Sequence, residues 1–273
     1  GTGDISVGDE RIHAESALAR FYERRAYELA WSTEEAVSPN VALLLEAIRA
    51  SEAEGMRPGD YHVSRIERTV QRIRGAVGDR EVEAALRVDL DLLCTDAFLL
   101  QAAHRLSGRV DPETIDREWI ANRRSQDLVP VLESALQHRT IGSALADRLP
   151  PQPEYVRLRE HLQRYRGFAA DGGWESVSGG PNLERGVQSP RVRALQRRLS
   201  AEGYDVSVSD TSAPRFDESL DRAVRTFQAR HGLDADGIVG PATLRALNVP
   251  ADVRARQIAL NMERWRWLPQ DLG

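Results

Sequence analysis

The sequence predicts a mainly α-helical protein with a multi-helix domain, a small three-helix domain and a connecting helix, in that order. Apolar residues recur at three- and four-residue steps through most of the chain, which is typical of helices that pack on one face. The pattern VRALQ at 192–196 recurs thirty-two residues later as VRTFQ at 224–228. A segment rich in Gly, Ser and Pro, residues 173–186, precedes this repeat and indicates a linker between two domains.

The composition is that of an ordinary globular protein. The chain has 273 residues, of which 41% are hydrophobic and 29% charged, and its formal net charge is -5. This length exceeds the usual size of one domain, so two domains are expected. The negative charge disfavours a nucleic-acid partner, because phosphate binding needs a basic surface. No apolar run approaches the roughly 20 residues that cross a bilayer, so we expect no transmembrane segment.

Residues 10–172 are expected to form the multi-helix domain, after a flexible tail at 1–9. The strongest helix signal is the stretch 82–106, which should form the core of this domain. Its apolar face consists of Leu86, Leu90, Leu93, Ala97 and Leu100. Further helices are expected at 12–22, 39–55, 63–73, 128–138, 141–148 and 154–169. The aromatic stretch 27–31 is short and is expected to be extended.

The small domain is expected at 187–249. Ser189 and Pro190 supply an N-cap and a first-turn proline for its first helix, and Asp217 can cap the second. The two helices should share one apolar core. That core consists of Val192, Leu195, Leu199, Val224, Phe227 and Leu244.

The last segment, 250–273, predicts an amphipathic helix with Ile258, Met262 and Trp265 on one face. Such a face must be buried, so we expect the helix to fold back on residues 10–170 with Trp265 largely buried. Alternatively, Trp265 and Trp267 could stack on sugar rings, because aromatic faces suit the apolar faces of saccharides.

Few residues are candidates for chemistry. Cys94 could be a thiol nucleophile, but it lies at an apolar position in the middle of a helix, which favours a buried structural role. The six histidines show no metal-ligand spacing, and Asp234 and Asp236 are more simply part of a turn than of a calcium loop. We therefore expect no metal and no other cofactor.

A pair of helix carboxylates keeps glycoside cleavage open as an alternative. Asp89 and Asp96 lie two turns apart and could share a helix face. Glycoside hydrolysis needs one carboxyl in an apolar pocket and a second one a few ångströms away. A solvated or capping role for both residues is the simpler interpretation.

The stretch 186–248 resembles the small three-helix peptidoglycan-binding domain, in which a "V..LQ..L...G" helix precedes "AV..FQ...GL..DG.VG..T...L". Three stretches of the larger domain resemble the helical scaffold domain of the large periplasmic murein L,D-transpeptidases. They are FYERRAYELAW, SPNVALLLEAIRASEAEGMRPGDYH and DLDLLCTDAFLLQAAHRLSGRVDP. In that family the scaffold precedes the peptidoglycan-binding module, and a helix similar to 248–273 leads into the catalytic domain.

The resemblance implies a periplasmic, wall-associated protein whose partners are the glycan strands and stem peptides of peptidoglycan, and other wall enzymes. The catalytic domain of that family carries a Ser-x-Gly-Cys-x-Arg motif, which this chain lacks. We therefore expect no catalytic residue here, and expect the helix 250–273 to lead to an absent catalytic domain. Two alternatives remain: a stand-alone wall-binding or regulatory protein that recruits a separate enzyme, and a lytic glycosidase that uses the helix carboxylates.

For ligand contacts, the sequence favours the place where the Asp-Gly turn meets the start of the third small helix. A helix start presents unpaired N–H groups that suit carboxylate or acetamido oxygens, and arginines nearby could pair with stem-peptide carboxylates. Alternatively, these residues only shape the turn. Gln196 and Gln228 should bond the backbone in the interior. The expected substrate-binding residues are Arg230, Asp236, Gly237, Gly240, Thr243 and Arg245.

Overall fold

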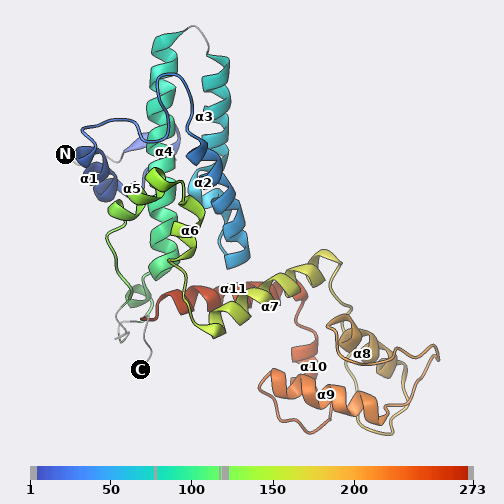
Figure 1. The fold of residues 1–273 in the computed structure, drawn as a ribbon. Coiled ribbons are helices and arrows are strands. Elements are labelled where there is room, and N and C mark those ends of the chain that lie inside the picture. The colour runs from blue at the N-terminus through green and yellow to red at the C-terminus, as the bar shows by residue number, and fades with distance from the viewer. Residues whose placement is uncertain (1–4, 77–78, 117, 119–122, 270–273) are drawn as a thin grey trace. The chain divides into compact units, whose positions relative to one another are not determined.

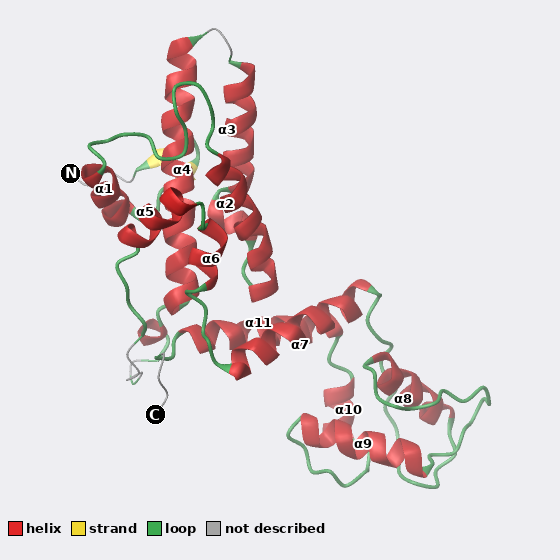
Figure 2. Cartoon of the chain, in the orientation of Figure 1, coloured by secondary structure: helices red, strands yellow, loops and turns green. Residues whose placement is uncertain are grey.

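The computed structural model describes residues 5–76, 79–116, 118 and 123–269 (Figure 1). Figure 2 shows that nearly all regular structure in them is helical, which confirms the predicted fold class. The described residues form two compact units. Unit 1 comprises those of Gly1–Arg159 and Ala259–Gly273, and unit 2 comprises Glu160–Ile258. None of the helices in these ranges is both long and apolar enough to cross a membrane.

Unit 1 is built around the long helix α4 (Arg80–Ser107). Its N-cap is Asp79, whose side chain accepts a hydrogen bond from the backbone N–H of Val82 at 3.2 Å. The apolar stripe predicted for this helix is buried at Leu86, Leu90 and Leu93, so α4 forms the core of the unit as expected. The helices that pack against it are α1 (Glu15–Arg24), α2 (Pro39–Ala50), α3 (Val63–Gly75), α5 (Val129–His138) and α6 (Ile141–Ala146).

The connections in unit 1 contain three 3₁₀ turns: η1 (Ser51–Glu54), η2 (Pro58–Tyr61) and η3 (Pro112–Thr114). Gly55 follows η1 with a φ of +73°, a left-handed conformation that ends the helical run begun by Pro39. The stretch 27–31 is not a regular strand. Tyr27 is left-handed there, and Trp31 is buried with its indole N–H donating to the hydroxyl of Thr95 at 2.9 Å.

The start of the described chain is more ordered than a flexible tail. Strands β1 (Ser6–Val7) and β2 (Glu10–Arg11) pair in an antiparallel hairpin. Val7 belongs to the core of unit 1. The expected tail at 1–9 is therefore wrong for residues 5–9, because an apolar side chain at position 7 anchors the hairpin, and residues 1–4 lie outside the described residues.

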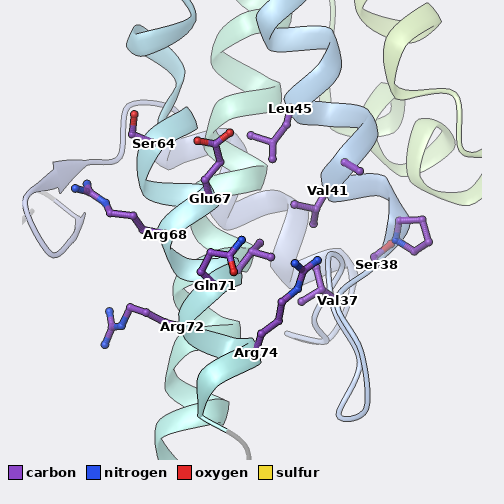
Figure 3. Close-up of a pocket in the computed structure, with 13 residues that line it drawn as sticks. Val37, Ser38, Val41, Leu45, Ser64, Glu67, Arg68, Gln71, Arg72 and Arg74 are labelled. Atoms are coloured by element: carbon purple, nitrogen blue, oxygen red, sulfur yellow. The ribbon is translucent and has the colours of Figure 1, made fainter.

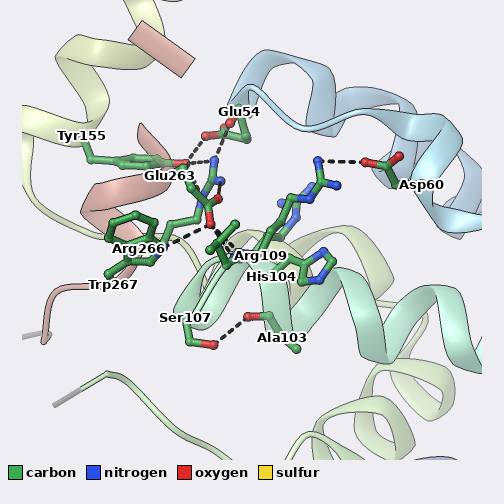
Figure 4. Close-up of polar contacts among 12 residues, drawn as sticks. Glu54, Asp60, Ala103, His104, Ser107, Arg109, Tyr155, Glu263, Arg266 and Trp267 are labelled. Carbon is green, nitrogen blue, oxygen red and sulfur yellow. Dashed lines mark hydrogen bonds and ion pairs between the residues drawn. The ribbon is translucent and has the colours of Figure 1, made fainter. Parts of the chain in front are cut away.

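The boundary between the units falls within α7 (Pro153–Ala170) and α11 (Ala251–Arg266). The C-terminal end of α11 packs in unit 1, as expected for a helix that folds back on the larger domain (Figure 4). Arg266 is buried there, donating to the backbone carbonyl of Glu54 and to the hydroxyl of Tyr155.

The C-terminal end of α11 covers Trp265 and, just beyond the helix, buries a second tryptophan. Met262 is fully buried, Trp265 is half-buried, and Trp267, beyond the helix end, is buried. Gly108 leaves room for its ring, since a Cβ at that position would lie 2.5 Å from Trp267. Most of the surface of Trp265 is covered, as expected, but the fully buried anchors at this end of α11 are Met262, Arg266 and Trp267.

Unit 2 contains α8 (Pro190–Ala201), α9 (Glu218–Arg230) and α10 (Pro241–Leu247). The predicted caps are present: Ser189 accepts from the N–H of Arg191 at 3.2 Å, and Asp217 accepts from that of Leu220 at 2.8 Å. Phe227 is fully buried in the shared core. That core also holds Val192, Leu195, Leu199 and Val224, with Leu244 packed against it.

The segment expected as a linker, 173–186, is fastened to unit 2. Val177 is buried, and its N–H donates to the side chain of Asn248 at 2.8 Å. The indole N–H of Trp174 donates to the carbonyl of Val249 at 3.1 Å. Its Gly-rich composition therefore indicates a segment without regular secondary structure that packs in unit 2, rather than a flexible linker.

Candidate functional site

The residues expected to bind ligand at the Asp-Gly turn are mostly engaged in holding the turn together. Gln228 is buried, and its side-chain amide donates to Asp236 Oδ1 at 2.8 Å and to the carbonyl of Ile238 at 3.0 Å. Its Oε1 accepts from the N–H of Gly237 at 2.9 Å, and its amide nitrogen lies 3.1 Å from Thr243 Oγ1. The predicted interior role of Gln228 is confirmed.

The electrostatics of Asp236 follow from this arrangement. The N–H of Ile238 and then the amide of Gln228 hold the pKa of the Asp236 carboxyl below its ordinary value. At Gly237, φ is +75° and a Cβ would lie 2.2 Å from Asp221 Oδ1, so only glycine fits the turn. These residues shape the turn, which is the second interpretation that the sequence left open.

The other expected contact residues do not form one site with the turn. Gly240 is the N-cap residue of α10, a helix of only seven residues. Arg245 is exposed on the same helix. Arg230, at the end of α9, lines a separate pocket to which none of the other five residues contributes.

This pocket is a polar cavity in unit 2 and has a volume of about 380 Å³. Three segments meet there: the second half of α7, the turn after α8, and the end of α9. Gly203 makes the turn after α8 with a φ of +86°. The lining residues are His161, Arg164, Tyr165, Glu202, Tyr204, Arg230 and His231.

The negative charge of Glu202 is already balanced within unit 2. Its carboxylate accepts from Arg198 Nη1 at 2.7 Å and from the hydroxyl of Tyr165. Burial, followed by this bond to Glu202, raises the pKa of Tyr165. Arg198 is itself buried and lies 3.7 Å over the ring of Trp174. The pocket wall at Glu202 is therefore a fixed, neutral cluster.

Two further guanidinium groups give the pocket its net positive character. Arg164 donates to the backbone carbonyl of Glu202 at 2.8 Å and is otherwise exposed. Arg230 is also exposed and lies 5.1 Å over the ring of Tyr204. A cation over an aromatic ring is held in place while its outer N–H groups still face water. Both arginines can thus donate to an oxygen-rich ligand.

His231 supplies a hydrogen-bond acceptor beside these donors. Burial lowers the pKa of its imidazole, although the bond to the carbonyl of Phe227 opposes that shift. Nδ1 lies 2.8 Å from this carbonyl oxygen and must donate to it, which leaves Nε2 as an acceptor. The pocket therefore combines charged donors, a neutral acceptor and an aromatic edge, a set suited to binding a polar ligand.

The structure does not support the candidate residues for chemistry. Cys94 is fully buried, and burial raises the pKa of its thiol well above the ordinary value, so the predicted core role is confirmed. Asp96 is fully buried and accepts from His62 Nε2 at 2.7 Å, whereas Asp89 is half-exposed. In the described ranges, no group of three or more His, Cys, Asp or Glu side chains could hold a metal ion.

Sequence reasoning found Arg230 but missed the rest of its pocket. Arg164 and Tyr165 belong to a helix that the sequence assigned to the larger domain, so no periodicity or motif links them to Arg230. His231 directly follows Arg230 at the end of α9 and could have been found as the next polar residue on that side. Tyr204 follows the glycine turn after α8, which is the only local signal for its position.

Comparison with known proteins gives two family matches and several partial relatives. Residues 188–247 match the family model described as "Putative peptidoglycan binding domain". The chain is similar to N-acetylmuramoyl-L-alanine amidase CwlL of Bacillus licheniformis, at 38% identity over 72 residues, or 26% of this chain and 20% of that protein. It is also similar to N-acetylmuramoyl-L-alanine amidase CwlM of Mycobacterium tuberculosis, at 43% identity over 75 residues, or 25% of this chain and 18% of that protein.

The chain thus spans about a fifth of the length of these curated relatives. Residues 16–162 match the family model described as "Scaffold domain", and this match covers more than half of the chain. On these matches, the chain belongs to the scaffold-domain family and carries a peptidoglycan-binding domain.

Proposed function

We propose that the chain binds peptidoglycan through unit 2, and that the pocket around Tyr204 and Arg230 holds a sugar residue of the glycan strand. The supporting observation is that this polar pocket lies in the unit that contains the match to the peptidoglycan-binding domain. Sugar hydroxyl and acetamido groups both donate and accept hydrogen bonds. Arg164, Arg230 and His231 offer the complementary partners around a ring face.

Overall charge does not assist this binding. The chain has a net charge of -5, and the stem peptides of peptidoglycan carry free carboxylates, so long-range attraction between the two is absent. Binding must therefore come from local sites whose charge opposes that of the whole chain. The two exposed guanidinium groups of the pocket provide such a site.

The role of unit 1 is a separate part of the proposal. Its scaffold-domain match and the sequence resemblance to L,D-transpeptidases favour a periplasmic support that orients an enzyme acting on stem peptides, as in wall cross-linking. A second candidate rests on the curated relatives, which are amidases. In that case the chain would position an enzyme that cleaves the bond between muramic acid and alanine.

Co-sedimentation of the full chain with purified sacculi tests the binding proposal. Arg230→Glu should weaken binding about tenfold or more, since a charge-assisted donor becomes a repelling carboxylate. Arg245→Glu is the matched control, because it makes the same charge change at another exposed arginine of unit 2, outside the pocket. Equal losses in the two variants would contradict the pocket as the binding site.

Activity measurements distinguish the two candidate roles of unit 1, support of a transpeptidase and support of an amidase. Sacculi incubated with the chain alone should release no stem-peptide products, and Cys94→Ala should leave both this result and binding unchanged. Adding the chain to a purified L,D-transpeptidase catalytic domain should increase its cross-linking of sacculi. An increase in amidase product release, with no effect on the transpeptidase, would instead favour the second candidate.

A further inference from the structure

Unit 1 has a groove of its own between α2 and α3, with a volume of about 940 Å³ (Figure 3). Its floor is aliphatic: Val41 and Leu45 of α2 are buried at its base, and Val70 of α3 is half-buried. None of the described residues that line it is aromatic or a methionine. Protein-binding surfaces are enriched in such anchors, so this lining favours a ligand with small apolar groups over a protein helix.

The charge on the α3 side of the groove is positive and uncompensated. Glu67, the acidic residue among the lining side chains, is paired with Arg49. Arg68, Arg72 and Arg74 also line the groove, and all three are exposed. Within the described ranges, none of these three side chains is engaged in a hydrogen bond or ion pair. A chain of net charge -5 thus places three free cations along one short helix.

The polar side chains of α3 lie on both sides of the helix, an arrangement that suits an elongated ligand. Figure 3 shows Gln71 and Arg74 on the side of α3 towards α2, with the Arg74 head beside Val37, whereas Arg68 and Arg72 extend to the other side of the helix. Gln71 offers an amide that can both donate and accept at the centre of the groove. A peptide lying across α3 would meet apolar floor, amide and guanidinium groups in turn.

We propose that this groove binds an acidic stem peptide of peptidoglycan. Alanine methyl groups fit the aliphatic floor formed by Val41, Leu45 and Val70. The free carboxylates of the peptide fit the guanidinium groups of Arg74, beside the floor, and of Arg72, across α3. The cavity volume lies within the roughly 300–1,000 Å³ of small-ligand sites. The inference deepens the proposed function and rests on it: unit 2 holds the glycan, and unit 1 takes the peptide attached to it.

Titration of the full chain with a soluble stem peptide, free of sugar, tests this proposal by calorimetry. The double variant Arg72→Glu/Arg74→Glu should weaken binding by about tenfold or more. Arg57→Glu is the control, because Arg57 is exposed in unit 1 and does not line the groove. A stem peptide whose carboxylates are amidated should also bind about tenfold more weakly to the unaltered chain.

Three results would overturn the inference. They are equal affinity of the double variant and the unaltered chain, equal affinity of the acidic and amidated peptides, and displacement of the stem peptide by an acidic amphipathic helix at much lower concentration. None of these results affects the Arg230→Glu comparison on sacculi, so failure of the groove and failure of the pocket are distinguishable. Circular dichroism confirms that the exposed substitutions leave the helices intact.

Discussion

Asp96 of unit 1 and Gln228 of unit 2 are both buried polar side chains, but their hydrogen bonds span different distances along the chain. In unit 1, the buried Asp96 accepts from the N–H of Ala14 at 2.6 Å, 82 residues away, and from His62, 34 residues away. In unit 2, the buried Gln228 bonds Asp236, Gly237 and Thr243, all within 15 residues. A local polar network is formed by one turn, whereas a long-range one exists only when the whole unit has folded.

The two networks predict different consequences when a hydrogen bond is lost. Loss of a local bond should loosen one turn, whereas loss of a long-range bond should weaken the packing between elements that lie far apart in the sequence. In unit 1 the carboxylate of Asp96 joins α4 to the start of α1 and to the residue before α3. Unit 2 depends instead on its small apolar core, which Phe227 fills.

The largest expected effect is the loss of unit 2 in Phe227→Ala. Truncating a buried phenylalanine costs about 3–5 kcal/mol, a large share of the stability of a small domain. Unit 2 should lose its cooperative unfolding transition while most helical signal of unit 1 remains. Calorimetry with circular dichroism checks this, and a small-domain transition unchanged in temperature would show that Phe227 is not the core residue we infer.

The second variant, Asp96→Ala, breaks the long-range network of unit 1. Removing one partner of a buried pair costs about 3–5 kcal/mol, because His62 and two backbone N–H groups lose their acceptor. Urea unfolding measures this loss. Asp89→Ala is the matched control on the same helix and should change the free energy of unfolding by less than about 0.5 kcal/mol. Similar losses of unfolding free energy in Asp96→Ala and Asp89→Ala would contradict the special role of the Asp96 network in unit 1.

Gln228→Ala tests the local network. It leaves the N–H of Gly237 without its partner and removes one donor to the carbonyl of Ile238, at a cost of about 1–3 kcal/mol in the unfolding of unit 2 alone. Gln163→Ala removes an exposed glutamine of unit 2 and should be nearly neutral. A Gln228→Ala variant as stable as this control would mean that the turn holds without the buried amide.

The smallest effect is a pH dependence carried by His62. Burial alone would lower the pKa of this imidazole, but the hydrogen bonds that it donates to Asp96 and Glu10 raise the pKa above its ordinary value of 6.5. A raised folded-state pKa stabilises unit 1 fully below pH of about 6.5, and this contribution is lost as pH rises through the folded-state pKa. The stability difference between the unaltered chain and His62→Gln should therefore shrink from pH 6 to pH 9 in urea unfolding. A difference that stays constant would show that His62 is neutral in the folded chain.

Most of the helices could be predicted from the sequence because their signals are local. Pro39, Ser189 and Asp217 mark helix starts by the chemistry of a single turn, and the stripe of α4 follows from spacing alone. The hairpin that includes residues 5–9 was not predicted, because strands of two residues show no periodicity. The buried Trp267 was missed because it lies beyond the helix whose face was used to predict burial.

The candidate site was predictable only in part. Arg230 was found because it belongs to the recognisable repeat, but Arg164 and Tyr165 reach the same pocket from a helix with no sequence link to it. Asp236 and Thr243 looked available because sequence does not show that Gln228 engages them. Sequence patterns identify which side chains are polar, and only the fold determines which of them remain free for a ligand.

The most direct test of the account is a backbone NMR titration of the full chain with two probes, glycan strands freed of stem peptides and stem peptides freed of sugar. We expect glycan strands to shift the amide signals around Tyr204 and Arg230, and stem peptides to shift those around Gln71 and Arg74. Glycan-induced shifts confined to the Asp236–Gly237 turn, or both probes acting on the same residues, would contradict the assignment of glycan to unit 2 and of peptide to unit 1.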